Sequence, residues 1–286
     1  MNDIQTIAKD AADYPSLLAE IHDPPEQLYV RGKFPDGVYF AVVGTRLPSA
    51  YGKQVTSKVV EPLAQAGLVI VSGLAYGIDA LAHEAALEAG GATVAVLGTG
   101  VDEESLYPRS HKKLARRIVE QGGAVISEYP PGTAGQPYHF PARNRIIAGL
   151  SRGVLVVEAR KKSGALITSD LSTRENRDVF AVPGPIINPA SFGPNQLIQQ
   201  GANPVMSAED ILEEYDITQP TTDDKRHSTL NEEERRVLDA LTEGALHVDA
   251  IGRALESPSA QLASLLTGLE LKGLIKSLGG GTYGKT

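Results

Sequence analysis

The sequence predicts an α/β protein whose central sheet is doubly wound and mostly parallel. Between residues 38 and 184, short continuous runs of Val, Ile, Leu and Ala alternate with longer amphipathic stretches. The apolar runs do not alternate with polar residues, and strands buried on both faces by helices show this pattern. A sheet of this kind, covered on both sides, is therefore expected.

The expected elements follow each other in strict alternation. Strands are expected in the apolar runs 38–44, 67–73, 92–98, 123–128, 153–159 and 178–184. Helices are expected in the amphipathic stretches between them, at 50–66, 78–90, 110–121, 143–150 and 164–175. Gly and small polar residues at the ends of the runs mark the turns.

Composition divides the rest of the chain. Residues 1–37 form a short N-terminal segment before the main domain at 38–215, and the polar, Pro-containing residues 216–229 are typical of a linker. In residues 230–286 we expect helices at about 231–241, 248–254 and 259–272, then two strands around a Gly turn. This pattern predicts a winged helix-turn-helix.

The net charge of -8 argues at first against a nucleic-acid partner. The basic residues, however, are clustered: residues 109–117 hold five and no carboxylate, and residues 143–162 hold six beside the single carboxylate of Glu158. Because the Debye length at physiological salt is about 8 Å, such local clusters decide phosphate binding. Residues 216–286 are acidic, so the winged helix is either a duplex reader or a protein-contact module.

The chain contains no Cys, which excludes disulfides and thiolate metal sites. We find neither a leader-like N-terminus nor about 20 uninterrupted apolar residues, so a soluble cytoplasmic protein without membrane contact is expected. No His spacing indicates a metal site, and no Ser, His and acid suggest a triad. No catalytic residue, metal or cofactor is predicted.

Small residues follow several expected strands. They occur at Gly44-Thr45-Arg46, Ser72-Gly73, Gly98-Thr99-Gly100 and Ser163-Gly164-Ala165. In an open parallel sheet these ends border the ligand crevice, where small residues let an anion approach the amides of the next helix. Each Gly alone could simply make a turn, but together with Arg46 they predict a phosphate site.

The segment FPARNR (140–145) is the strongest candidate for binding a polynucleotide. Arg143, Asn144 and Arg145 are expected where a short helix begins, beside a loop carrying Phe140. Fixed positive charge, free backbone donors and a ring face suit a phosphate backbone with attached bases. Tyr107 is a second candidate for base stacking.

Two further patterns have alternative interpretations. Asp79 and His83, spaced i, i+4, could be an acid-base pair, but we favour a structural role at a helix N-terminus and on a packed face. The amphipathic run 195–205 could form a dimer contact through Leu197 and Ile198, or it could pack within the core of one protomer.

The segments 14–32, 42–52, 72–87, 93–108, 126–133, 140–151, 156–169, 179–185 and 193–205 resemble the DprA/Smf family of bacterial DNA-processing proteins. The resemblance implies an extended Rossmann-like domain that binds and protects single-stranded DNA, forms a homodimer, and loads the RecA recombinase during natural transformation. The family often has a longer helical N-terminal domain than the residues that precede Tyr14.

The residues matched to the family's motifs are Arg46, Arg109 or Lys112, and Phe140 with Arg143, Asn144 and Arg145. The full set of expected DNA contacts is Gly44, Thr45, Arg46, Ser72, Gly73, Arg109, Lys112, Phe140, Arg143, Asn144 and Arg145.

The alternative is a nucleotide-binding enzyme or sensor similar to the phosphoribohydrolases, which have related sheets. Such enzymes need a catalytic carboxylate beside a PGGxGT loop, and this chain has SGALIT (163–168) instead. Glu158 remains a candidate base in this alternative.

Overall fold

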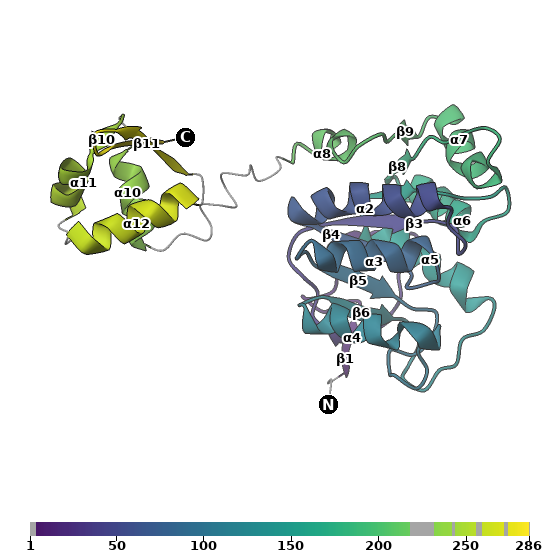
Figure 1. Cartoon of the computed structure of the whole chain (residues 1–286). Helices are drawn as coiled ribbons and strands as arrows, with labels where there is room; N and C mark the ends of the chain where they lie inside the picture. The colour runs from purple at the N-terminus through teal and green to yellow at the C-terminus, as the bar shows by residue number, and fades with distance from the viewer. Residues whose placement is uncertain (1–3, 218–231, 242–243, 256–258, 272–273, 286) are drawn as a thin grey trace. The chain divides into compact units, whose positions relative to one another are not determined.

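The computed structural model describes residues 4–217, 232–241, 244–255, 259–271 and 274–285. The chain forms two compact units, Met1–Gln219 and Pro220–Thr286, which are described separately (Figure 1). The expected linker at 216–229 lies outside the described residues apart from its first two positions. No helix within the described ranges is long and apolar enough to cross a membrane.

The first unit is built on a nine-stranded sheet. Its strands are β1 (Ile4–Ala8), β2 (Gln27–Gly32), β3 (Val38–Val43), β4 (Leu68–Ser72), β5 (Thr93–Val96), β6 (Ala124–Ser127), β7 (Gly153–Val156), β8 (Asp178–Ala181) and β9 (Asn203–Pro204). Their order is β1-β2-β6-β5-β4-β3-β7-β8-β9, and every pairing from β6 to β9 is parallel. The predicted doubly wound, mostly parallel sheet is confirmed.

The N-terminal segment belongs to this same sheet. Strand β2 pairs antiparallel with β6, and β1 pairs antiparallel with β2, so residues 1–37, which were expected as a short segment before the main domain, contribute two strands to its sheet. Leu28 and Val30 of β2 are fully buried. The two strands are short and partly exposed, so their sequence lacks the continuous apolar runs of β3 to β8.

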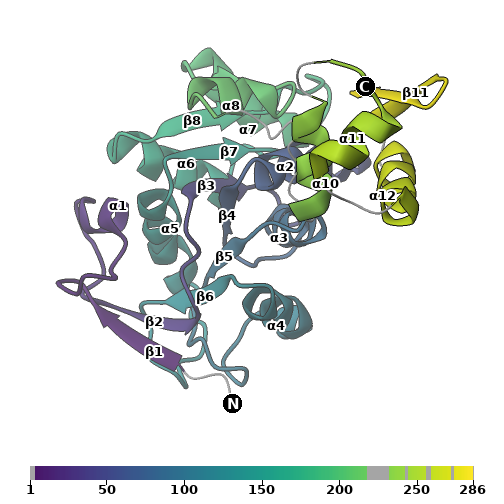
Figure 2. The same ribbon diagram turned by 90° about the vertical axis from the view of Figure 1, so that its left-hand side faces the viewer.

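Helices cover both faces of the sheet, as Figure 2 shows for α5 and α6 on one side and α3 and α4 on the other. One face carries α1 (Ser16–Ala19), α5 (His139–Leu150), α6 (Gly164–Arg174) and α7 (Phe192–Gln199). The other carries α2 (Ala50–Gln65), α3 (Ile78–Glu88), α4 (Lys112–Glu120) and α8 (Glu209–Glu214). In β3, Ala41 and Val43 face the first layer, while Phe40 and Val42 face the second, as strand geometry requires.

The sheet reverses its winding between β3 and β7. From β3 the chain moves outward through β4 and β5 to β6, then returns to place β7 on the other side of β3. The loops after β3 and β7 consequently diverge at the carboxyl end of the sheet, and a crevice opens between such loops in folds of this class.

In the second unit, the described residues form three helices and a small sheet. The elements are α10 (Glu232–Ala240), β10 (Leu246–His247), α11 (Val248–Leu255), α12 (Ser259–Leu271), β11 (Ile275–Gly279) and β12 (Thr282–Lys285). The sheet order is β10-β12-β11, and Gly279 to Gly281 turn the hairpin with positive φ angles. The expected winged helix is confirmed, with the two-residue strand β10 as an addition.

A buried histidine connects α3 to the central strands. His83 is fully buried, and its Nδ1 lies 2.7 Å from the Thr93 hydroxyl. That hydroxyl donates to the Ile70 carbonyl, so it accepts from Nδ1–H and leaves Nε2 unprotonated. Burial, aided by the charges of His111 and Arg143, lowers the pKa of His83 to about 3.

This lowered pKa predicts an acid sensitivity of the fold. The unfolded chain gains a proton on this imidazole below about pH 6.5, whereas the folded chain does not until far lower pH. The free energy of unfolding therefore decreases as the pH is lowered, by up to about 1.4 kcal/mol per pH unit. His83→Gln should reduce the slope of unfolding free energy against pH in urea titrations between about pH 6 and 4.5. His22→Gln, at an exposed position, is the control; equal slopes for the native protein and His83→Gln would contradict the assignment.

Candidate nucleic-acid interface

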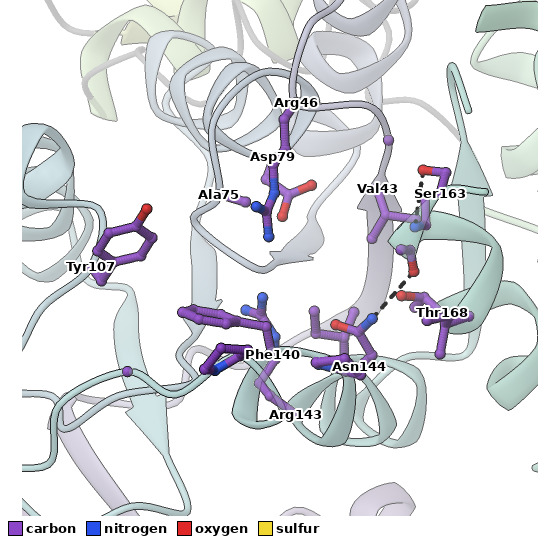
Figure 3. Close-up of a pocket in the computed structure, with 18 of the residues that line it drawn as sticks. Val43, Arg46, Ala75, Asp79, Tyr107, Phe140, Arg143, Asn144, Ser163 and Thr168 are labelled. Carbon is purple, nitrogen blue, oxygen red and sulfur yellow. Dashed lines mark hydrogen bonds between the residues drawn. The ribbon is translucent and has the colours of Figure 1, made fainter. Parts of the chain in front are cut away.

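A cavity of about 890 Å³ opens at the carboxyl end of the sheet, at the β3/β7 switch (Figure 3). Its walls come from the loops after β3, β4 and β7, from the beginnings of α5 and α6, and from the segment before α4. The cavity therefore lies where small residues after the strands predicted a phosphate site.

Four exposed cations border this cavity: Arg46, Arg109, Arg160 and Lys162. In the part of the chain that the structure describes, no carboxylate lies within ion-pair distance of any of the four. Their positive charge is thus available to a ligand, and the carboxylates that line the same cavity are Asp79 and Glu104.

Arg143 reaches the cavity floor but is not free. Only 4% of it is exposed, and its Nη1 donates to the carbonyls of Gly73, at 2.7 Å, and of Val96. Burial lowers the pKa of this guanidinium to about 10, although the charge of Asp79 opposes the shift. A Cβ at Gly73 would come within 2.5 Å of Nη1, so this glycine makes room for the arginine. Arg143 therefore holds the floor together.

Arg145 points away from the cavity. Its Nη1 and Nη2 each lie 2.7 Å from a carboxylate oxygen of Glu128, and its Nε donates to the carboxylate and carbonyl oxygens of Asp23. The side chain does not line the cavity. The expectation that this charge faces a phosphate backbone is not supported, because two carboxylates already neutralise it.

The side chains of Arg143 and Arg145 point in different directions because of where α5 starts. The helix begins at His139, four residues before the expected start at Arg143, and Pro141 lies in its first turn. Proline is tolerated there because the first amide hydrogens of a helix have no partner within it. Phe140 is consequently helical, and Arg143 and Arg145 lie in the second turn, on different sides of the helix.

Asn144 links α5 to the turn that starts α6. Its Nδ2 donates to the Gly164 carbonyl at 3.3 Å, and the Ser163 hydroxyl accepts from the Ala165 amide as the N-cap of α6 (Figure 3). Asn144 is 8% exposed and lines the cavity. It fixes the amino end of α6, where the helix dipole favours negative charge.

Two aromatic rings stand at the cavity edge. The centroids of Tyr107 and Phe140 are 5.7 Å apart with a tilt of 54°, and Tyr107 is 50% exposed. Gly98 and Gly135 pack against the Phe140 ring, where any Cβ would contact it at 3.0 to 3.1 Å. The rings can therefore offer a face to a base while the glycines hold Phe140 in place.

Gly44 and Thr45 line the cavity as expected, whereas Ser72, Gly73 and Lys112 do not. Ser72 is fully buried and donates to the Val42 carbonyl at 2.6 Å. Lys112 starts α4, and its charge lowers the pKa of Glu103 together with Arg116 and Arg31. Arg116, by its hydrogen bonds, is the largest of these causes.

The cavity also includes residues that were not selected as contacts. Arg160, Lys162, Ser163 and Thr168 come from the loop after β7 and from α6. The basic cluster at 143–162 and the small residues at 163–165 were both visible in the sequence. The pairing of β7 with β3, which brings this loop to the same cavity as Arg46, could not be predicted from the sequence.

Glu158, the candidate base of the enzymatic alternative, has a structural position. It is 1% exposed, does not line the cavity, and accepts from the Ser49 amide at 2.9 Å and the Ser49 hydroxyl at 2.5 Å. Its own carbonyl accepts from the Thr45 amide at 2.7 Å. The carboxylate therefore anchors the loop that carries Arg46.

The expected dimer anchors belong largely to the core of one protomer. Leu197 is 8% exposed and packs in the core cluster below α7, and Ile198 packs against the same cluster. Core packing was the alternative that the sequence left open. Among the described residues, no group of three or more His, Cys, Asp and Glu side chains could hold a metal ion.

Comparison with known families agrees with the resemblance seen in the sequence. The model of DNA recombination-mediator protein A matches residues 5–216, and the model of the DprA winged helix domain matches residues 220–281. DNA processing protein DprA of Bacillus subtilis (strain 168) is 45% identical over 214 residues, which are 74% of this chain and 71% of that protein. Protein Smf of Escherichia coli (strain K12) is 39% identical over 285 residues, 96% of this chain and 76% of that protein.

Two solved structures share the fold. DprA from Streptococcus pneumoniae superposes with a TM-score of 0.68 at 46% identity, covering 74% of each chain. DNA processing protein A from Helicobacter pylori, described for its unique single-stranded DNA binding mode, superposes with a TM-score of 0.65 at 29% identity, covering 74% of this chain and 95% of that one. Because the family model matches well over half of its length, the chain belongs to the DNA recombination-mediator protein A family, which includes the DprA and Smf proteins.

Proposed function

We propose that the chain binds single-stranded DNA by its phosphate backbone along the rim of the cavity. The observation that carries the proposal is the group of four exposed cations around one opening, none of which has a carboxylate partner among the described residues. A relative with the same fold is described for single-stranded DNA binding, which supports this ligand. Single strands need a cationic track for the backbone and ring faces for the bases.

The geometry favours sequence-tolerant binding. Arg46 and Arg109 come from the segments after β3 and β5, whereas Arg160 and Lys162 come from the loop after β7, on the other side of the switch in strand order. Tyr107 offers an exposed ring face at the same cavity, and every base can stack on such a face. The overall negative charge does not prevent this, because fields beyond about 8 Å are screened.

The family supports a wider role in recombination. We propose that the protein forms a homodimer, protects the bound strand and loads the RecA recombinase onto it during natural transformation. A dimer would place two cavities on one strand, and the second contact would then form at a high effective concentration. The acidic winged helix can serve this role as a protein-contact module or as a second DNA-binding element.

The enzymatic alternative has less support. Glu158 is buried and occupied by two donors from Ser49, so it does not face a substrate in the cavity. We therefore propose a binding protein without catalytic residues and without a cofactor.

Substitution of single rim cations tests the proposed track. Four phosphate contacts predict a slope near -3 in a plot of log affinity against log salt for oligo(dT), at about 0.7 per contact. Arg46→Ala and Arg160→Ala should each weaken binding about tenfold and reduce the slope by about 0.7. Fluorescence anisotropy at several salt concentrations measures both quantities.

Arg117→Ala is the matched control, since Arg117 is exposed on α4 and does not line the cavity. Its affinity and slope should equal those of the native protein. A native slope near zero, or equal losses in Arg117→Ala and Arg46→Ala, would contradict a track along this rim.

A direct assay separates binding from hydrolysis. Incubation with nucleoside monophosphates should release no free base above the buffer control, measured by chromatography. The reason is that Glu158, the candidate base of the enzymatic alternative, is buried and does not line the cavity. Release of base that disappears in a Glu158→Gln variant of intact fold would establish the enzyme instead.

The assembly and the recombinase role can be measured on the full chain. Light scattering should give a mass of about twice 30.3 kDa.

Addition of the protein to single-stranded DNA coated by its single-strand binding protein should shorten the lag of RecA ATP hydrolysis. An unchanged lag at saturating protein, with the DNA bound, would reject the loading role.

A further inference from the structure

Asp79 is a buried carboxylate at the floor of the cavity. It lies in the first turn of α3, is 7% exposed, and lines the opening together with Arg143 (Figure 3). The backbone amides of Gly44, Gly73 and Ala75 lie beside its carboxylate and lower its pKa, against the larger effect of burial, which raises it. These donors come from the loops after β3 and β4, and none of them belongs to α3 itself.

The three amides are the donors that such a fold offers to a bound phosphate. In doubly wound sheets, an anion sits at the carboxyl ends of the strands on free amide hydrogens of the following turn. Here the chain supplies its own anion at this position. A phosphate group that reached the floor would meet this carboxylate in front of the amides.

Arg143 does not restore an anion site at the floor. Its charge faces Asp79, and its Nη1 is engaged by the carbonyls of Gly73 and Val96. The floor thus contains one buried positive and one buried negative group. Because buried charges are stable only when paired and hydrogen-bonded, a second anion at this depth would leave one of them uncompensated.

A role for Asp79 in helix capping alone does not account for this arrangement. A capping carboxylate accepts from amides of its own helix at the second or third position. Asp79 instead lies beside three amides that precede the helix and come from two different loops. The carboxylate also lines the cavity, so it contributes to what the cavity admits.

We propose that Asp79 determines the specificity of the cavity by occupying its phosphate position, so that terminal phosphates and free mononucleotides are rejected and strands bind through internal diesters. The inference rests on the proposed function for the strand, but the rejection of mononucleotides can be measured independently. The diesters bind at the rim, on Arg46, Arg109, Arg160 and Lys162, whose charges are not compensated.

The native protein provides the first test. Oligo(dT) with and without a 5′-phosphate should bind with equal affinity within about twofold, and thymidine 5′-monophosphate should not displace either strand at about 1 mM. Both are measured by anisotropy at about pH 8, because burial raises the pKa of Asp79. A 5′-phosphate that tightens binding by about fivefold or more would overturn the proposal.

The second test uses Asp79→Asn. Asparagine keeps the volume, but its NH2 group cannot accept, so at least one amide loses its acceptor and Arg143 keeps an uncompensated charge. Calorimetry should show thymidine 5′-monophosphate binding at least about tenfold more tightly to this variant than to the native protein. Circular dichroism shows whether the variant is folded. If it is not, the proposal is tested by the binding of oligo(dT) with and without a 5′-phosphate to the native protein.

Glu104→Gln is the control, since Glu104 lines the same cavity but lies exposed at its edge. It removes the same charge without releasing the three amides. An equal gain in both variants, or no gain in a folded Asp79→Asn, would overturn the proposal. Failure of the native protein to bind oligo(dT) would instead reject the proposed function, because the mononucleotide titrations do not depend on strand binding.

Discussion

The buried side chain of Arg143 is the group on which the shape of the cavity depends. It comes from α5 on one face of the sheet, and its Nη1 donates to the carbonyls of Gly73 and Val96 at the carboxyl ends of β4 and β5. Asp79 comes from α3 on the other face and lines the same cavity, and its charge raises the pKa of Arg143 against the effect of burial. Arg143 thereby fixes α5 to the ends of β4 and β5.

Around this balanced floor, the cations divide into two groups with different functions. Arg143 is bonded to two backbone carbonyls and Arg145 to two carboxylates, and both hold elements of the fold together. Arg46, Arg109, Arg160 and Lys162 stand at the rim, and none of them has a carboxylate partner among the described residues. A residue's type and its place in a basic cluster therefore do not indicate which group it joins. The bonded partners decide: Glu128 and Asp23 for Arg145, and the carbonyls of Gly73 and Val96 for Arg143.

This division explains how much could be predicted from the sequence. The strands β3 to β8 are visible because each is buried on both faces and reads as a continuous apolar run, and the crevice follows from the small residues after them. The start of α5 is not visible, because Pro141 reads as a helix breaker although the first turn tolerates it. The orientations of Arg143 and Arg145 depend on that start, since residues two apart on a helix point about 200° apart. The position of Leu197 in the core could not be separated from an exposed apolar face by periodicity alone.

The arrangement also gives a physical reason why a polymer suits this cavity better than a monomer. A mononucleotide offers one concentrated charge, which is best bound by converging amides at the end of a strand, and here the cavity floor carries the buried carboxylate of Asp79. A strand offers many separate single charges, which spaced cations can bind one by one with release of counterions at each contact. No single rim cation needs a deep pocket for this, and each can remain solvated until the strand arrives. The same sheet edge that serves nucleotide binding in other doubly wound proteins is thus suited to a polyanion once its floor is neutral and its rim is positive.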